Sequence, residues 1–164
     1  VSKSLSSAYR VGWFCLPDRF QPLHAKIMLQ NVMVNTPLQL GLADLIHSRA
    51  YRQHLNQLKL ILKQQVQDYR YCIDQAFSGV PIGINQPTGG YVLWLQLPEC
   101  IDSIEMYDFA QSKGINIVPG LVFGEDARYN NCVRLNAGHE LSEEIRQAIQ
   151  CLADWVKQKM KLSN

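Results

Sequence analysis

The first residues of the chain include a lysine and an arginine whose side chains could do chemistry. Lys3 lies in a segment rich in hydroxyl side chains, and Arg10 follows seven residues later, just before Gly12 and Trp13. A deprotonated primary amine can attack an aldehyde and form an imine. A guanidinium offers a planar set of donors that suits phosphate and carboxylate groups. The spacing alone also fits a surface lysine and an arginine that is paired with a carboxylate.

Three later segments complete a pattern that begins with the lysine. Residues 87–98 are PTGGYVLWLQLP, residues 114–123 are GINIVPGLVF, and residues 133–136 are VRLN. Together with residues 2–13 (SKSLSSAYRVGW), they resemble the C-terminal part of a fold-type I aminotransferase-like domain that depends on pyridoxal 5′-phosphate (PLP). The lysine segment most resembles the MocR subfamily of GntR-family transcriptional regulators, and the 2-aminoadipate-type aminotransferases are close relatives. The resemblance covers essentially the whole chain, with the segments in family order.

The resemblance implies roles for four side chains. Lys3 would be the catalytic lysine that forms a Schiff base with PLP, and Arg10 would contact the cofactor phosphate. Arg134 would bind the α-carboxylate of an amino-acid substrate or effector through a bidentate fork, which fixes orientation as well as charge. Phe123 would line the same pocket. Two alternatives stay open: Arg134 in a structural ion pair at the rim of a sheet, and Phe123 as a core aromatic behind a turn.

Several parts of a complete PLP site are missing from the sequence. Such a site also needs an acid at the pyridine nitrogen, an aromatic that stacks on the ring, and further phosphate ligands. In the family these lie before the lysine, and the chain begins only two residues before Lys3, without an initiator Met. We therefore expect residues upstream, and we expect the 164-residue chain by itself not to bind PLP tightly.

Two functions of the parent protein are compatible with these residues. The first is a transcriptional regulator whose aminotransferase-like domain binds PLP and senses an amino acid or amine, with DNA bound by a separate N-terminal domain. The second is an enzyme of the 2-aminoadipate aminotransferase type, in which Lys3 also shuttles the α-proton as a general base. The local resemblance favours the regulator. In either case the family implies a homodimer.

Composition narrows the remaining possibilities. The net charge is +2 and 47% of the residues are apolar. The basic residues form no stripe along the sequence that would track nucleic acid. Its five cysteines include no pair at C-x-x-C spacing, which argues against a disulfide framework and a zinc site. The four histidines show no metal-ligand spacing, and we expect no metal. No apolar run is long enough to span a membrane and no signal peptide is evident, so we expect a cytoplasmic location.

The first part of the chain is predicted to be mainly helical. Residues 11–16 form a short apolar run that indicates a buried strand. A helix is predicted over 18–33, and Thr36 is the expected N-cap of a second helix that runs to His47. Ser48 is the expected cap of the longest helix. Its apolar positions step by three and four residues over about seven turns: Tyr51, Leu55, Leu58, Leu62, Val66, Tyr69, Ile73 and Phe77.

The second part alternates between strands and helices. Strands are predicted over 80–84, 91–97, 115–118 and 132–136. Asp102 and Glu105 have the spacing of a capping box that opens a helix, and Ser142 starts the last helix. This order predicts an α+β fold: the small C-terminal domain of a fold-type I PLP-dependent transferase, with a small sheet covered by helices. Residues 1–45 would be a remnant of the PLP-binding large domain, and residues 46–164 the small domain.

Overall fold

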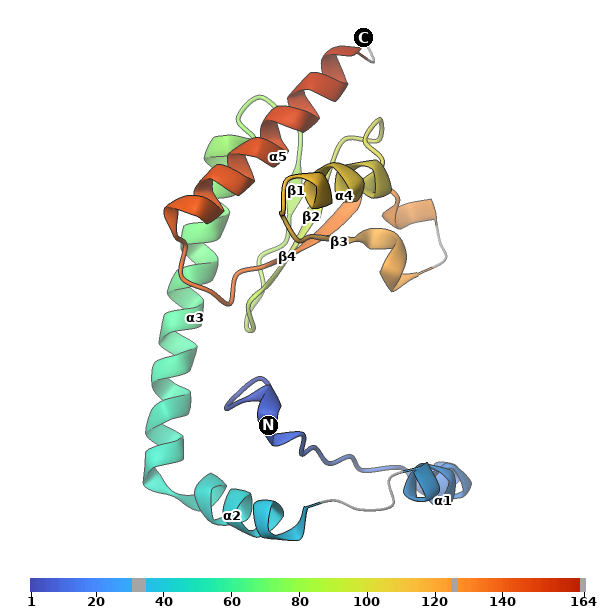
Figure 1. The fold of residues 1–164 in the computed structure, drawn as a ribbon, viewed down its shortest axis with the longest axis vertical. Helices are drawn as coiled ribbons and strands as arrows, with labels where there is room; N and C mark the ends of the chain where they lie inside the picture. Colours follow the sequence, from blue (N-terminus) through green and yellow to red (C-terminus); the bar gives the residue numbers. More distant parts are fainter. Residues whose placement is uncertain (31–34, 125–126, 163–164) are drawn as a thin grey trace. The chain divides into compact units, whose positions relative to one another are not determined.

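The structure, a computed structural model, describes residues 1–30, 35–124 and 127–162. It divides into two compact units, Val1–Leu58 and Lys59–Asn164, and each is described by itself. Figure 1 labels their elements. The predicted domain boundary between residues 45 and 46 stays a prediction. None of the described helices is long and apolar enough to cross a membrane.

The first unit consists of short helices joined by extended chain. Its elements are two 3-10 turns, η1 Ser7–Tyr9 and η2 Asp18–Phe20, then α1 Gln21–Gln30, α2 Thr36–His47 and the first turns of α3 Arg49–Ala76. The prediction of a helix over 18–33 is confirmed as far as residue 30, and residues 31–34 lie outside the described part of the chain.

The predicted strand over residues 11–16 is wrong. These residues form no strand in the structure, and Trp13 within them is 71% exposed. A strand needs a hydrogen-bonded neighbour, because its backbone groups are otherwise unpaired. The first unit contains no other described strand that could pair with this segment. The apolar composition of residues 11–16 therefore does not make them a strand here.

The starts of α2 and α3 are set by side-chain caps. Asn35, and not the predicted Thr36, caps α2: its side chain accepts a hydrogen bond from the Leu38 amide at 3.1 Å. Ser48 caps α3 as predicted, with its hydroxyl accepting from the Tyr51 amide at 3.0 Å. Either cap satisfies an amide that would otherwise lack a partner in the first turn.

The second unit is built on a four-stranded antiparallel sheet. Its order is β1-β2-β4-β3, and the strands are β1 Gly83–Ile84, β2 Val92–Gln96, β3 Val118–Pro119 and β4 Cys132–Asn136. Three helices pack on it: the C-terminal part of α3, α4 Ser103–Ser112 and α5 Glu143–Leu162. The predicted α+β arrangement of a small sheet covered by helices is confirmed.

The two central strands match their predictions closely, and the two edge strands do not. Most of the predicted segments 80–84 and 115–118 lie outside β1 and β3. Pro81 has no amide hydrogen to give to a ladder. The Ile115 amide donates to the Ala110 carbonyl at 2.8 Å, which closes the end of α4 instead of joining the sheet. Local chain geometry therefore shortens both edge strands, β1 and β3.

The core lies between one face of the sheet and the helices. Leu93 and Leu95 of β2 are at most 1% exposed, whereas Trp94 between them faces the opposite side of the sheet and is half-buried. Successive side chains of a strand point to opposite faces, so the sheet has a core face and an outer face. The core residues of the helices are Val66, Tyr69, Ile73, Ala76, Met106, Ala110, Ile149, Leu152, Ala153 and Val156.

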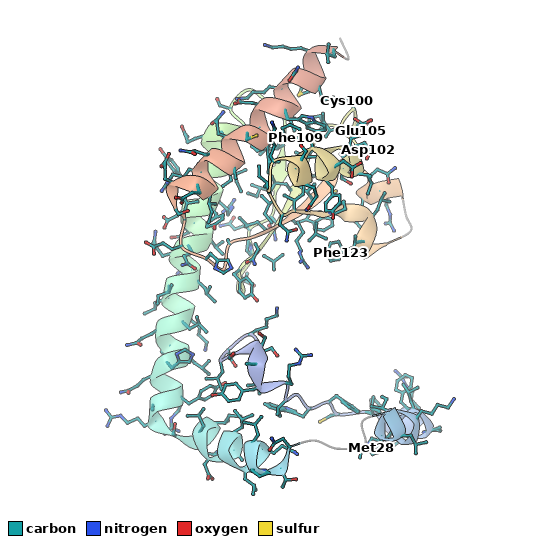
Figure 2. All side chains as sticks on the ribbon, in the orientation of Figure 1. Met28, Cys100, Asp102, Glu105, Phe109 and Phe123 are labelled. Atoms are coloured by element: carbon teal, nitrogen blue, oxygen red, sulfur yellow. The ribbon has the colours of Figure 1, made fainter. Side chains whose placement is uncertain are left out.

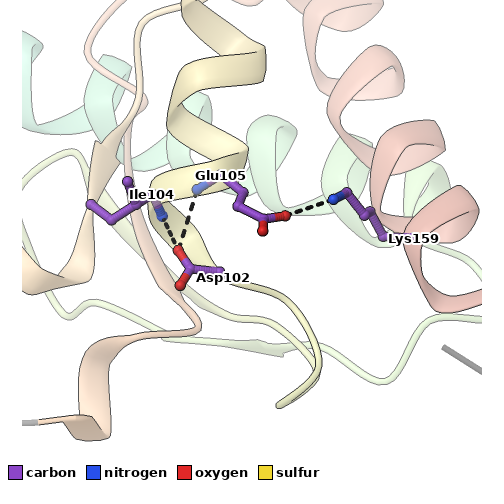
Figure 3. A network of polar contacts seen from close by, with 4 residues as sticks. All are labelled: Asp102, Ile104, Glu105 and Lys159. Atoms are coloured by element: carbon purple, nitrogen blue, oxygen red, sulfur yellow. Dashed lines mark hydrogen bonds and ion pairs between the residues drawn. The ribbon is translucent and has the colours of Figure 1, made fainter. Parts of the chain in front are cut away.

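Polar contacts cap α4 and join α5 to both α4 and α3. The Asp102 carboxylate caps α4, accepting from the Ile104 amide at 2.7 Å and the Glu105 amide at 3.2 Å (Figure 3). The Glu105 carboxylate, which was expected to complete a capping box, bonds the Lys159 ammonium at 2.6 Å. Lys157 donates to the carbonyl of Ala76, the last residue of α3, at 2.7 Å. These two lysines therefore make specific contacts near the end of α5.

Candidate functional site

The lysine of the predicted site lies on a tight turn at the start of the first unit. The amides of Ser4 and Leu5 both donate to the Val1 carbonyl, at 3.2 and 3.0 Å, so the backbone folds back around Lys3. The Lys3 side chain is exposed. Two side chains of α3 reach this turn: Tyr51, whose hydroxyl lies 3.1 Å from the Ser4 hydroxyl, and His54, whose Nε2 lies 2.8 Å from the Ser4 carbonyl oxygen.

Arg10 has an unusual backbone conformation. Its φ of 49° lies in the left-handed region, and it is the only non-glycine residue in the described part of the chain with a positive φ. It follows η1, whose first turn is capped by the Ser6 hydroxyl, an acceptor for the Ala8 amide at 3.2 Å. A left-handed L-residue costs about 1–2 kcal/mol. Strain of this kind is concentrated at functional segments, and the role of Arg10 at the cofactor phosphate stays a prediction.

Arg134 lies in the middle of the sheet, on its outer face. It is opposite Trp94 of β2 on one side and Val118 of β3 on the other. Its guanidinium carbon lies 5.2 Å from the centre of the Phe123 ring, within the range of a cation–π contact. The Arg134 side chain is half-buried, and Phe123 is 46% exposed.

Two further aromatic side chains, Trp94 and Tyr129, continue from Phe123 through edge-to-face contacts. Trp94 meets Phe123 edge to face at 5.4 Å and Tyr129 edge to face at 5.7 Å. Phe123 is the last residue of η3 Gly120–Phe123, and Figure 2 shows it in the segment after β3, whereas Phe109 lies on α4 near α5. A Cβ at Gly120 would overlap the Tyr129 carbonyl oxygen, so only glycine lets these two segments approach so closely.

The charge of Arg134 is not neutralised within the described part of the chain. No carboxylate there forms an ion pair with its guanidinium, while Glu125 and Asp126 lie outside the described residues. The alternative of a structural ion pair therefore finds no support among the described contacts. Two residues before Arg134 on β4, burial raises the pKa of the Cys132 thiol, partly offset by a hydrogen bond with the Trp94 side chain. Such a thiol stays protonated and is a weak nucleophile.

The predicted site residues thus fall into two groups. Arg134 and Phe123 are in contact on the outer face of the sheet, and Lys3 and Arg10 belong to the first unit. The sequence prediction missed Trp94 as the neighbour of Arg134 and Tyr129 as the neighbour of Trp94, although the alternation of β2 places Trp94 on the face away from the core. It also missed Tyr51 and His54, for which the sequence offers no signal. The described residues contain no cluster of His, Cys, Asp or Glu suited to a metal ion.

Comparison with known proteins places this geometry in context. No family model matches the chain. It is 28% identical over 162 residues to the uncharacterised HTH-type transcriptional regulator YjiR of Escherichia coli, covering 98% of this chain and 34% of YjiR. It is also 28% identical to aromatic-amino-acid aminotransferase 1 of Thermococcus litoralis, covering 98% of this chain and 38% of that protein. The chain therefore spans little more than a third of the length of these relatives.

A solved structure shows the same fold. The α-aminoadipate aminotransferase LysN of Thermus thermophilus, complexed with N-(5′-phosphopyridoxyl)-L-leucine, superposes with a TM-score of 0.80 at 22% identity. The match covers 98% of this chain and 41% of LysN. At this level of identity the match establishes the fold alone. Taken with the sequence relatives, it shows that this chain carries part of the fold-type I aminotransferase-like fold and is homologous both to HTH-type transcriptional regulators and to aminotransferases.

Proposed function

We propose that this chain is the C-terminal part of a PLP-dependent transcriptional regulator of the MocR type, whose aminotransferase-like domain senses an amino acid or amine. Among its relatives, YjiR and YdcR of Escherichia coli and YdfD of Bacillus subtilis are HTH-type transcriptional regulators, and each is matched over about a third of its length. DNA binding would belong to a region outside this chain. A cytoplasmic location and a homodimer are parts of the same proposal.

The observation that carries the proposal is the position of Arg134. A half-buried guanidinium with no described carboxylate partner, held over the Phe123 ring, is suited to accept a carboxylate from a ligand. The planar fork of an arginine binds a carboxylate through two parallel hydrogen bonds, which orients the ligand as well as attracting it. The Phe123 ring that contacts this guanidinium is itself packed edge to face against Trp94, the partner of Arg134 in the sheet register.

The donor set of the first unit fits PLP. Lys3 supplies an exposed primary amine on a turn of fixed backbone, and Arg10 supplies an exposed guanidinium on a strained residue nearby in sequence. PLP, when bound, supplies an aldehyde that condenses with amines and a ring that withdraws electrons. Lys3 would hold the aldehyde carbon and Arg10 the phosphate. Arg134 would orient an incoming amino acid by its carboxylate.

The proposal is tested in the longer protein that contains this chain. The purified protein should show the visible absorbance band of protein-bound PLP, and Lys3→Ala should remove that band. In the unchanged protein, binding of its target DNA, or transcription from its own promoter, should respond to an added amino acid or amine. A Lys3→Ala variant that keeps the band and the ligand response would contradict the assignment of Lys3.

An aminotransferase is the second candidate, because one relative is an aromatic-amino-acid aminotransferase and the fold is that of LysN. In that case Lys3 would also move the α-proton of the substrate as a general base. The two candidates are separated by incubating the protein with amino acids and 2-oxo acids and measuring amino transfer. Sustained turnover that Lys3→Ala abolishes, in a protein without a winged-helix region, would favour the enzyme.

A further inference from the structure

We propose that Tyr51 and His54 of α3 are positioning residues for the turn that carries Lys3. The proposal rests on the proposed function in one respect, namely that Lys3 is the cofactor lysine. Neither residue belongs to the four motif segments, which are residues 2–13, 87–98, 114–123 and 133–136. Both are separated from the lysine by about fifty positions in the sequence. Their contacts with the neighbouring Ser4 carry the argument.

Two hydrogen bonds attach Ser4 to α3. The Tyr51 hydroxyl and the Ser4 hydroxyl lie 3.1 Å apart, and His54 Nε2 lies 2.8 Å from the Ser4 carbonyl oxygen. Because that oxygen can only accept, His54 must donate from Nε2. Tyr51 and His54 are three residues apart and therefore lie on the same face of the helix. The residue next to Lys3 is thus attached through both its side chain and its backbone.

The hydrogen bonds to Ser4 have a defined direction because Tyr51 lies in the first turn of α3. The Ser48 hydroxyl accepts from the Tyr51 amide at 3.0 Å, so Tyr51 is fixed within the capped first turn of the helix. The Tyr51 side chain is half-buried, and its ring centre lies 6.5 Å from that of His54. On the other side, the Ser4 amide is bonded to Val1 within the turn itself. The backbone at Lys3 is therefore held although its own side chain is exposed.

This arrangement matters because a lysine has a long, flexible stem. The position of its amine is set first by its backbone, and an error of about 1 Å in a reacting group can cost a hundredfold in rate. The bond from His54 is also selective for a protonation state: only imidazolium or the neutral form with hydrogen on Nε2 can donate to the Ser4 carbonyl. The neutral form with hydrogen on Nδ1 should therefore be depleted.

The test uses the 164-residue chain and needs no PLP. Three variants are compared with the unchanged chain: His54→Leu, which removes the donor, His54→Gln, whose side-chain amide can replace Nε2, and Tyr51→Phe, which removes only a hydroxyl. His139→Leu is the matched control, because His139 is an exposed histidine of the second unit. The measurements are hydrogen exchange of residues 1–10, the pH profile of Lys3 acetylation by acetic anhydride relative to exposed Lys63, and the nitrogen NMR shifts of His54.

We expect His54→Leu and Tyr51→Phe to raise exchange in residues 1–10 by about two- to tenfold, the range for the loss of one hydrogen bond. Both variants should change the ratio of Lys3 to Lys63 acetylation, while His54→Gln restores it and His139→Leu leaves it unchanged. The NMR shifts of neutral His54 should show hydrogen on Nε2. An acetylation ratio that stays at the unchanged value in both variants would overturn the proposal, and so would exchange that rises equally in the second unit. A PLP band that survives Lys3→Ala in the longer protein would instead refute the proposed function and leave the attachment of the turn standing.

Discussion

Replacing Arg134 by alanine in the longer protein tests the ligand-binding role most directly. Arg134 is paired with Trp94 and Val118 in the sheet register, and its side chain is half-buried and has no described carboxylate partner. Truncating one member of a buried, hydrogen-bonded charge pair costs about 2–5 kcal/mol. We therefore expect the affinity for the amino-acid ligand to fall by about thirty-fold to several thousand-fold.

A substitution of Phe123 tests the contribution of its ring separately from the charge of Arg134. Phe123→Leu keeps the guanidinium and removes the cation–π contact at 5.2 Å. Because Phe123 is 46% exposed, that contact should be worth only about 0.5–1 kcal/mol, or a two- to fivefold loss of affinity. A loss in Phe123→Leu as large as that in Arg134→Ala would mean that the ring, and not the charge, dominates binding.

Calorimetric titration with a panel of amino acids and the matching amines that lack a carboxylate measures both effects. The unchanged protein should prefer the amino acid to the amine, and Arg134→Ala should lose that preference. Urea unfolding of each variant controls for a loss of structure. A loss below about 0.5 kcal/mol, as for an exposed ion pair, would assign Arg134 to the structure of the sheet. An equal loss for amino acid and amine would refute carboxylate recognition.

Three further predictions concern the stability of the 164-residue chain. Asp102→Ala should lower the unfolding free energy by about 1 kcal/mol, because two amides of α4 lose their acceptor, whereas Asp102→Asn should retain most of it in urea unfolding. Gly120→Ala should cost at least about 1–3 kcal/mol, because its Cβ would lie 2.9 Å from the Cys132 Cβ and overlap the Tyr129 carbonyl; an unchanged urea midpoint would contradict that packing. Burial raises the pKa of the Cys132 thiol above its ordinary value of 9.0, so the unfolded state releases this proton first and stability should fall as the pH rises past about 9. Cys132→Ala should make this alkaline decline shallower, and an identical slope would exclude the thiol as its source.

The secondary structure that the sequence predicted correctly is the part set by local patterns. The alternation of residues 91–97 and 132–136 predicted the two central strands, and the stripe along α3 predicted a helix from Ser48 onward. Such patterns are local because the pleat of a strand and the turn of a helix repeat within a few residues. The apolar run over residues 11–16 failed as a strand because pairing depends on a neighbour that composition does not reveal.

For the site, the sequence by itself supplied the predicted residues and the resemblance to aminotransferase-like proteins. Lys3, Arg10, Arg134 and Phe123 were predicted from segments in family order, and the relatives are HTH-type regulators and aminotransferases. Only the tertiary structure decided what surrounds them. The register of the sheet sets Arg134 opposite Trp94, and the missing side chain of Gly120 lets the Tyr129 backbone approach closely.

The same holds for the turn at Lys3, which Tyr51 and His54 reach from about fifty residues away. The spacing of residues predicts neighbours along one helix or strand, but it does not predict which distant segments come into contact after the chain has folded. Lys3 could therefore be named from the sequence as the predicted reactive group, whereas the contacts that Tyr51 and His54 make with its turn became visible only in the folded chain.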